Sequence, residues 1–365
     1  MSDVIVIGGG VIGCAVACEL SRRGLSITLA EPRAIGAGAS QASAGMLAPY
    51  TEGRHDRVLQ ALGGRSLALY DDLVASLASE GHHVTYNRSG SLDIALDDDA
   101  ADQLAELAKA AGAEGTDCEL IDAAALRAME PVVSPRARGA LRLPAHGYVS
   151  VSGLVEATWN SAVRRSAQLR RGVVRSVKPG HGTVRVLFDD GPQDAPYVVM
   201  AAGSWSGAID VDGVLPLPVR PVRGQLVALS WPSVSPRHTL WGPGCYAVPW
   251  PDGTLLVGAT VEEVGFAEQP TAGGVQGLLN AITELTPDAA GATFTGVRVG
   301  LRPATPDDRP IVGASTRVEG LVYATGHYRN GALLAPLTAH AVADLIGGHP
   351  LDAAWEPCAP ARFGQ

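Results

Sequence analysis

A stretch near the N-terminus, residues 4–31, constrains the fold more than any other part of the chain. It reads VIVIGGGVIGCAVACELSRRGLSITLAE, an apolar run, glycines in G-x-G-x-x-G spacing, a helical segment and a second apolar run. Gly8 permits a tight turn, Gly10 lets a pyrophosphate approach the backbone, and Gly13 lets helix and strand pack closely. The helix N-terminus would bind the phosphates and Glu31 a ribose. The pattern predicts a βαβ dinucleotide site rather than a glycine-rich turn of another α/β protein, and leaves open whether the dinucleotide is NAD or FAD.

Apolar periodicity along the rest of the chain predicts a second, sheet-rich domain. Buried strands like the first are predicted at residues 197–202 and 321–325, whereas strand patterns of an antiparallel sheet dominate residues 219–261. We predict helices over residues 57–80, 100–111, 122–129, 152–167, 274–285 and 333–346, strands over 139–144 and 297–303, a β-ribbon over 172–188, and a hairpin within 84–96 around Arg88–Gly90. The predicted class is α/β, a nucleotide domain (1–83, 146–215 and 296–365) interrupted by a mainly antiparallel β domain (84–145 and 216–295).

Composition excludes several classes of function. The 365 residues carry a net charge of −9 without clustered basic residues, which argues against nucleic acid as a partner. No apolar run is long enough to span a membrane, so we expect no membrane association and a cytoplasmic location. Five scattered cysteines make no disulfide framework, and Cys14 and Cys18 are interpreted as core residues rather than a metal or redox pair. The histidines show no metal-ligand spacing, and no metal is predicted.

Three features outside the glycine stretch suggest chemistry. Arg302 precedes a proline, which favours extended backbone, so its side chain would project from a strand end. A planar guanidinium binds a carboxylate with two hydrogen bonds, although Arg302 could instead be a structural arginine tied to Asp307 or Asp308. Tyr246 lies on a sheet strand and could be an ordinary sheet aromatic. The third feature is the polar turn at residues 326–331, which precedes a helix; its arginine could be a surface or ion-pair residue.

At these residues the sequence resembles the D-amino-acid-oxidase-type flavoprotein amine oxidases, and within them the glycine oxidase (ThiO) branch. The motifs are VIGGGVIG, SAGMLAP, AAGSW, GLRP, TPDDRPIVG and ATGHYRNGALLAP, and the resemblance covers residues Val4 to Pro336. The resemblance implies noncovalent FAD rather than NAD, held in a Rossmann-like FAD-binding domain with an inserted substrate-binding domain. The isoalloxazine would lie between the two domains.

The resemblance also implies the site residues. Arg302, Tyr246 and Arg329 would line the substrate pocket as the catalytic group. His327 would contact the flavin through its backbone rather than act as a base. The implied cofactor-binding residues are Gly8, Gly10, Val11, Ile12, Gly13, Glu31, Pro32, Ala39, Ser40, Ala44, Gly45, Met46, Val174, Gly203, Gly300, His327, Tyr328, Arg329, Asn330, Gly331, Ala332 and Leu333. Pro32 has no N–H to donate there.

The implied reaction is oxidative deamination of glycine, and of sarcosine and D-alanine, by hydride transfer to flavin N5. The small amino-acid substrate and O₂ would give an imine or glyoxylate, ammonia and hydrogen peroxide, with the imine supplied to thiazole formation in thiamine biosynthesis. A homotetramer is implied. The alternatives are a D-amino-acid dehydrogenase that reduces quinone, a sarcosine-oxidase-like enzyme and an inactive FAD-binding protein. A flavin tethered by a cysteine near the C-terminal motif is disfavoured, since no cysteine lies between Cys245 and Cys358.

Overall fold

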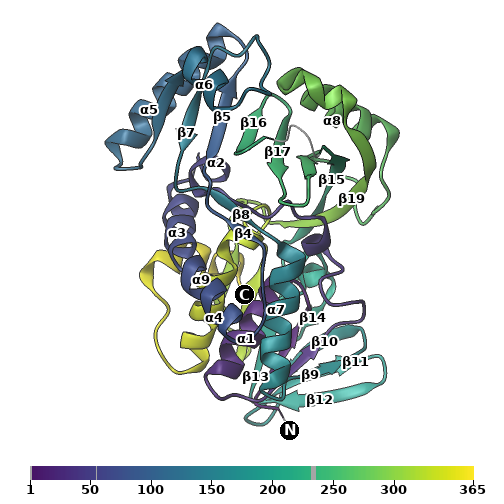
Figure 1. Cartoon of the computed structure of the whole chain (residues 1–365). Coiled ribbons are helices and arrows are strands. Elements are labelled where there is room, and N and C mark those ends of the chain that lie inside the picture. The colour runs from purple at the N-terminus through teal and green to yellow at the C-terminus, as the bar shows by residue number, and fades with distance from the viewer. Residues whose placement is uncertain (1, 55, 232–235) are drawn as a thin grey trace.

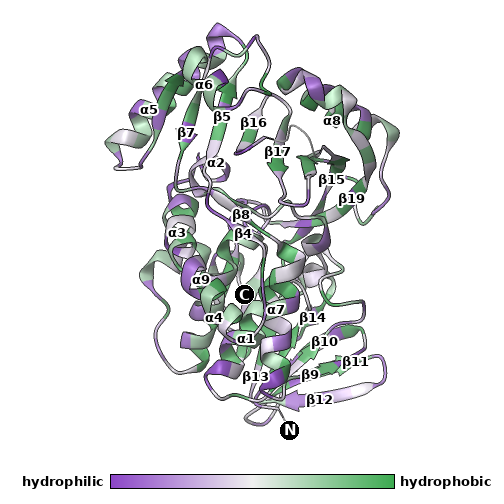
Figure 2. Cartoon of the chain, in the orientation of Figure 1, coloured by the Kyte–Doolittle hydropathy of each residue, from purple (hydrophilic) through white to green (hydrophobic). Residues whose placement is uncertain are grey.

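Two layered bodies make up the molecule, one built on a mainly parallel sheet and one on a mainly antiparallel sheet (Figure 1). The computed structural model describes residues 2–54, 56–231 and 236–365. The chain passes between the two bodies several times, so each is assembled from segments that are far apart in the sequence (Figure 1). Apolar residues concentrate on the strands and on the helix faces that cover them (Figure 2).

The first body is centred on β1, which lies between β13 and β2 in parallel register. Its six-stranded sheet has the order β20 (Ile311–Ala314), β21 (Leu321–Thr325), β13 (Tyr197–Met200), β1 (Val4–Ile7), β2 (Ile27–Ala30) and β9 (Gln168–Arg170). Only β20 runs antiparallel to its neighbour among these described strands. Val4 and Val6 of β1 pack on one side of the sheet and Ile5 and Ile7 on the other, because successive side chains of a strand point to opposite faces. Both faces are therefore covered, which explains the unbroken apolar runs.

Helices cover one face of this sheet and a small sheet covers the other. The helices are α1 (Val11–Arg22), α3 (Arg57–Ala68), α4 (Tyr70–Ser79), α7 (Val151–Arg164) and α9 (Gly331–Ile346). The opposing four-stranded sheet is ordered β12 (Gly191–Ala195), β11 (Val184–Phe188), β10 (Val174–Pro179) and β14 (Asp210–Val211). Of the two serines that could cap α7, Ser150 and Ser152, it is Ser150 that accepts a hydrogen bond from the Gly153 N–H, at 3.2 Å. The predicted helices and the predicted ribbon in these segments are confirmed.

The second body is a long mixed sheet, of which one face packs on helices and the other faces the first body. The order is β19 (Thr293–Ala304), β15 (Arg220–Ser230), β18 (Thr254–Gly258), β17 (Cys245–Pro249), β16 (Thr239–Gly242), β5 (Ser91–Ala95), β7 (Gly139–Leu143) and β6 (Glu119–Asp122). One face packs on α6 (Ala123–Met129) and α8 (Ala272–Leu285), and α5 (Asp98–Ala113) packs near β7. On β17, Ala247 faces the helices whereas Tyr246 and Val248 face the first body.

The predicted hairpin around Arg88–Gly90 is wrong. Asn87 ends β4 (Tyr86–Asn87), which pairs with β8 (Gly147–Val149) in a three-stranded sheet that β3 (Met46–Leu47) completes. Ser91 begins β5, which pairs with β7 in the eight-stranded sheet. The alternating pattern identified both strands correctly, but periodicity fixes which face a residue occupies and not which strand it pairs with. The segment between them carries the chain from one body to the other.

The predicted division into two discontinuous domains stays a prediction, and one of its boundaries meets an unbroken strand. The boundary between residues 295 and 296 falls inside β19, which pairs with β15 from Thr293 to Ala304. Arg302 therefore lies within this strand, two residues before its end, rather than at the end itself. Residues 296–304 are hydrogen-bonded into the eight-stranded sheet.

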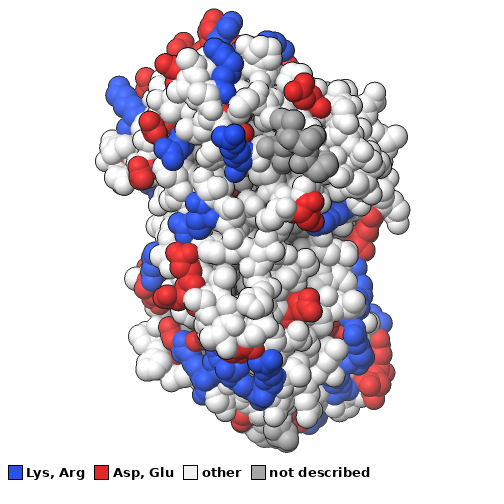
Figure 3. Space-filling view, viewed as in Figure 1, with Lys and Arg blue, Asp and Glu red and all other residues white. Residues whose placement is uncertain are grey.

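Several surface and core features bear on the excluded functions. Cys14 and Cys18 are buried in the main core, at 0% and 2% exposure, and both are free thiols. In the described ranges no three histidine, cysteine or acidic residues cluster as metal ligands. None of the described helices has the length and apolar character to cross a membrane. Basic and acidic side chains are interspersed over the face that Figure 3 shows.

The remaining short segments are α2 (Pro49–Glu52) and 3₁₀ turns at Ala39–Ala42, Gly203–Ala208, Pro287–Gly291, Ala353–Cys358 and Pro360–Phe363.

Candidate functional site

A continuous cavity of about 580 Å³ lies between the two bodies, at the carboxyl ends of the parallel strands. Ile7, Ala30, Ala201 and Ala324 line it from the ends of β1, β2, β13 and β21, and Tyr246 lines it from the opposite sheet. Open α/β sheets bind their ligands at this edge. The volume is in the range of small-molecule and cofactor sites.

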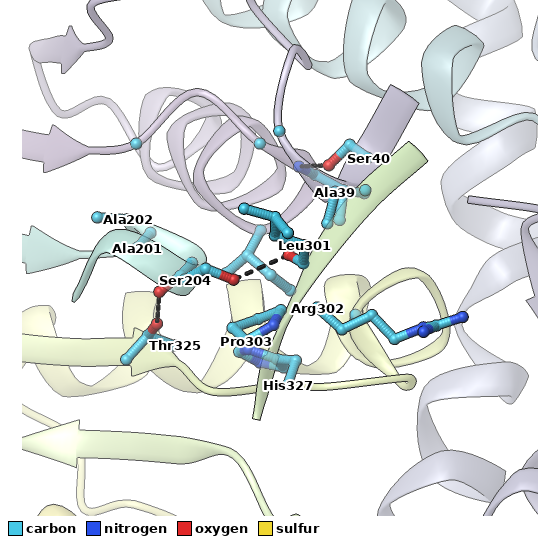
Figure 4. Close-up of a pocket in the computed structure, with 18 of the residues that line it drawn as sticks. Ala39, Ser40, Ala201, Ala202, Ser204, Leu301, Arg302, Pro303, Thr325 and His327 are labelled. Carbon is cyan, nitrogen blue, oxygen red and sulfur yellow. Dashed lines mark hydrogen bonds between the residues drawn. The ribbon is translucent and has the colours of Figure 1, made fainter. Parts of the chain in front are cut away.

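The structure brings the residues predicted from the sequence together in this cavity. All three predicted catalytic residues line it, and so do all predicted cofactor-binding residues except Gly13. Figure 4 shows part of this lining, contributed by β19, by the turn after β13 and by the turn before α9. Their roles toward a cofactor and a substrate stay predictions. Gly13 has a packing position instead, since a Cβ there would lie 1.9 Å from the Gly8 carbonyl oxygen.

The glycine turn after β1 is held open toward the cavity. The Gly9 N–H donates to Glu31 Oε2 at 2.8 Å, and the Arg33 N–H donates to Glu31 Oε1 at 2.8 Å. The Val11 N–H donates to Ser40 Oγ at 2.9 Å (Figure 4). A Cβ at Gly10 would meet only Ser40 Oγ, at 3.4 Å, so this glycine leaves free space in front of the N-terminus of α1. That cradle fits the pyrophosphate of a dinucleotide.

A second helix N-terminus faces the cavity at α9. Gly331, Ala332 and Leu333 form its first turn and line the cavity, and the first N–H groups of a helix have no partner inside it. The preceding His327 is buried, and its Nε2 lies 3.0 Å from Thr338 Oγ1. Burial lowers the pKa of His327 to about 3, so the imidazole is neutral at physiological pH. This end of the cavity therefore favours negative charge through backbone amides and the helix dipole.

Arg302 occupies the end of the cavity that lies against the eight-stranded sheet. Its side chain leaves β19 and extends away from Ser204 and Thr325 (Figure 4). Nη1 donates to the carbonyl oxygen of Thr260 at 3.0 Å. Asp307, one of the two structural partners considered for Arg302, is bound instead to Arg362 Nε, at 2.9 Å. Among the described residues Arg302 has no carboxylate within salt-bridge distance, which leaves its charge available to a ligand.

Gly224 is a functional position that the sequence analysis missed. It pairs with Gly300 across β15 and β19, and a Cβ on it would lie 2.3 Å from both terminal nitrogens of Arg302. The guanidinium therefore lies flat against the backbone of β15. A glycine in the interior of a predicted strand is a signal that could have indicated this close approach.

Three more polar side chains surround the Arg302 guanidinium. Tyr246 is 7% exposed, and burial raises the pKa of its hydroxyl to about 12, with Arg302 opposing, so it stays a hydrogen-bond donor at neutral pH. Arg329 lines the same end and lies over the Tyr328 ring. Glu52, at the end of α2, was not predicted; its Oε2 lies 3.6 Å from Arg329 Nη1. Arg329 is thus both an ion-pair residue and a cavity residue.

A buried polar network fixes α2, and with it Glu52. Asp93 of β5 binds Arg54 Nη2 at 2.5 Å and accepts a hydrogen bond from Thr51 Oγ1 at 3.4 Å. His146 Nε2 accepts from the Tyr50 N–H at 3.3 Å, and its Nδ1 lies 2.8 Å from Ser91 Oγ. Burial lowers the pKa of His146 to about 3, which agrees with the acceptor role of Nε2. These contacts tie both ends of α2 to the eight-stranded sheet.

Acidification should weaken this network. The pKa of His146 falls from 6.5 to about 3 on folding, so between these values the unfolded chain binds a proton that the folded chain excludes. The stability that neutral His146 contributes is complete above pH 6.5 and is lost as pH falls toward 3. From pH 7 to pH 5 we expect the wild type to lose about 2 kcal/mol more unfolding free energy than His146→Gln. Chemical denaturation at both pH values measures this, and parallel losses in the two proteins would contradict it.

Comparisons with known proteins agree with this geometry. The family model described as FAD dependent oxidoreductase (DAO) matches residues 3–345. The glycine oxidase of Geobacillus kaustophilus is 34% identical over 94% of this chain and 92% of the relative. A crystal structure of glycine oxidase from the same organism has a TM-score of 0.92 at 31% identity, covering 98% of each chain. That of iminodiacetate oxidase (IdaA) from Chelativorans sp. BNC1 has a TM-score of 0.86 at 27% identity, covering 98% of each chain.

Longer proteins also match. The bifunctional protein ThiO/ThiG of Nostoc sp. (strain PCC 7120) is 35% identical over 94% of this chain but only 52% of its own length. The chain therefore spans about half the length of these bifunctional relatives. The residues matched by the family model include all residues that line the cavity, from Ile7 to Leu333.

Proposed function

The chain belongs to the FAD dependent oxidoreductase (DAO) family, and from this premise we propose that it oxidises the amine of a small amino acid, glycine first. FAD is the cofactor. Sarcosine and D-alanine are the further candidate substrates. With O₂ as acceptor, glycine, O₂ and water give glyoxylate, ammonia and hydrogen peroxide. The similarity to proteins named glycine oxidase over nearly the whole of both chains supports this choice.

The observation that carries the proposal is the Arg302 guanidinium at the sheet end of the cavity. It is held by backbone carbonyl oxygens rather than by a carboxylate of the described chain, and Tyr246 lies beside it as a second donor. A substrate carboxylate bound by this pair would be fixed in position. Its α-carbon would then be directed toward the part of the cavity that Gly45, Met46 and the first turn of α9 line. A fixed orientation of the reacting carbon supplies much of the rate enhancement in such a reaction.

The chain's own residues contribute positioning and electrostatics. FAD, when bound, supplies the acceptor for the two electrons and the hydrogen that leave the α-carbon. The amide groups at the start of α9 stabilise negative charge that develops at their end of the cavity. His327 is neutral and bound to Thr338, so it supports the turn and takes no proton from the substrate. The substrate amine must be unprotonated, and the reaction should therefore become faster as pH rises toward the pKa of that amine.

A substrate panel with simultaneous oxygen and peroxide measurement tests the proposal. Glycine, sarcosine, D-alanine and larger D-amino acids are assayed with purified holoenzyme. Oxygen consumption with equimolar peroxide, largest for glycine or sarcosine, is the expected result. Turnover only with a quinone or dye acceptor would identify a dehydrogenase. No turnover with any acceptor would leave an FAD-binding protein without this activity.

FAD should be bound without a covalent link. No cysteine lines the described part of the cavity. Cys245 and Cys358 are the cysteines on either side of the C-terminal motif in the sequence, and burial raises the pKa of each thiol to about 12, which makes both unreactive. Acid precipitation of the yellow protein should therefore release all its FAD into the supernatant. Colour that stays with the pellet would mean a covalent link.

Three further expectations concern context. We propose that the imine is passed on to thiazole formation in thiamine biosynthesis, which the 35% identity to a protein named ThiO/ThiG supports. A cytoplasmic location and a homotetrameric assembly also stay predictions. Growth without thiamine of a strain that lacks its own imine source, when this chain is expressed, would test the first of them.

A further inference from the structure

The substrate end of the cavity contains two guanidinium groups and one carboxylate. Arg302 and Arg329 line it, and Glu52 is the acidic side chain beside them. The Glu52 side chain is 10% exposed, and its Oε2 lies 3.6 Å from Arg329 Nη1. Arg302 binds the carbonyl oxygen of Thr260, which is uncharged. With Glu52 ionised, this end of the cavity therefore carries one uncompensated positive charge.

A buried network anchors the segment that carries Glu52. The α2 helix that carries it is tied to β5 through the Asp93 contacts with Thr51 and Arg54. It is also tied to the β7–β8 connection through the Tyr50 N–H and His146 Nε2. The carboxylate is therefore carried on an anchored segment, and at 10% side-chain exposure it forms part of the cavity wall. Apart from Glu31, which is bound to the glycine turn, the other acidic residue that lines the cavity is Glu268, and it pairs with Arg33 at 3.1 Å.

We propose that Glu52 is a specificity-determining residue: its carboxylate neutralises Arg329, so that the cavity accepts amino acids with one carboxylate and rejects those with a second acidic group. This rests on the proposed function. A monocarboxylate matches the single free charge of Arg302. A second carboxylate on the substrate would have to displace Glu52 from Arg329 or lie beside it, and juxtaposed like charges discriminate strongly against a wrong ligand. The balance of charged side chains at this end of the cavity thus selects the substrate class, and the shape of the pocket selects further.

Two unreactive ethers test this without turnover. Methoxyacetate and diglycolate are the oxygen analogues of sarcosine and iminodiacetate, and they differ in the second carboxylate alone. Each is titrated into FAD-loaded enzyme and its Kd is read from the change in the flavin absorbance spectrum. Because neither compound is oxidised, the result does not depend on whether glycine is the substrate. Failure of the proposed function would show in the substrate panel, whereas failure of this inference would show here.

The wild type should bind methoxyacetate more tightly than diglycolate. In Glu52→Gln the ratio of the two Kd values should shift toward diglycolate by at least about tenfold, because Arg329 is then free for the second carboxylate. Glu52→Asp keeps the charge and should stay near the wild-type ratio. Glu268→Gln removes a carboxylate from the same cavity at a different place, and should leave the ratio unchanged.

A pH series provides a second reading of the same group. Burial raises the pKa of Glu52, whereas Arg329, Arg302 and Arg54 oppose that rise, and Tyr246 on the facing strand stays protonated. Below the pKa of Glu52 its carboxyl is neutral and Arg329 is unpaired, so the wild-type preference for methoxyacetate should weaken as pH falls. In Glu52→Gln the ratio should not change with pH.

Three outcomes would overturn the inference. One is a wild type that binds both ethers equally, and another is an unchanged Kd ratio in flavin-loaded Glu52→Gln. Loss of FAD from Glu52→Gln at normal secondary structure content would do the same, since Glu52 would then retain the cofactor rather than select the substrate.

Discussion

Arg302→Leu is expected to lower kcat/KM for glycine by roughly thirty- to several-thousand-fold while FAD content stays at the wild-type level. The guanidinium would form the fork that holds the substrate carboxylate, and leucine leaves that carboxylate desolvated and unpaired. Removal of one member of a buried charge pair costs about 2–5 kcal/mol, much of it from the charge left behind. At about 1.4 kcal/mol per factor of ten, that free energy corresponds to the stated loss. Steady-state kinetics and the flavin-to-protein ratio are the two measurements.

Two further variants separate the fork from general effects of the substitution. Arg302→Lys keeps the charge but not the planar pair of donors, so it should recover only part of the activity. Arg298→Leu makes the same change at an exposed position four residues earlier on β19, and should leave kcat/KM near wild type. If Arg302→Leu keeps its glycine activity, or loses FAD together with it, the anchor role is wrong.

Gly10→Val is expected to abolish FAD retention in a protein that still folds. Gly10 has φ −80° and ψ −174°, which a non-glycine residue also adopts, and a Cβ there meets only Ser40 Oγ, at 3.4 Å. The backbone therefore has room for a Cβ at this position, and the valine side chain would project into the space that the pyrophosphate needs. Purified Gly10→Val should be colourless, with the secondary structure content of the wild type. A variant with full FAD occupancy would show that the phosphates lie elsewhere.

Gly13, the next glycine of the motif, is a less informative position than Gly10, and Gly277 provides a control. A Cβ at Gly13 would lie 1.9 Å from the Gly8 carbonyl oxygen, so Gly13→Val would disturb the packing of α1 on β1 and could lose FAD through misfolding. Gly277→Val adds the same side chain on the exposed face of α8, where no atom lies within 4 Å. It should keep FAD and activity.

Local patterns were sufficient to predict the first βαβ unit, the helices of the first body, its strands β13 and β21 and the β10–β11 ribbon, but not the edge strands β9 and β20. The spacing after the glycines predicts a helix from Cys14 to Arg23, whereas the helix begins three residues earlier, at Val11, with Gly10 as its cap. The reason is that the glycine turn already has helical geometry at its second half, which apolar spacing alone does not reveal. The segment at Val84–Leu96 was misassigned as a hairpin because alternation identifies strands but not their partners.

Residues of the candidate site could be predicted where they belong to a sequence motif, but not where only tertiary contacts bring them into the site. Arg302, Tyr246 and Arg329 lie together in one cavity, as the resemblance implied. Glu52 was missed because an acidic residue at the end of a short helix is usually exposed, and only the Asp93 and His146 contacts turn it inward. Gly224 was missed because its importance lies in the Arg302 side chain that packs on it from another strand.

Anaerobic mixing of the holoenzyme with glycine isolates the transfer of electrons from substrate to flavin, because no other acceptor is present. We expect the yellow flavin absorbance to be bleached at a rate that saturates with glycine and rises with pH as the amine loses its proton. Admission of O₂ should then restore the absorbance, with one peroxide formed per flavin. A flavin that stays oxidised under saturating glycine, or is reduced but does not react with O₂, would contradict the assignment as a glycine-oxidising, oxygen-dependent enzyme.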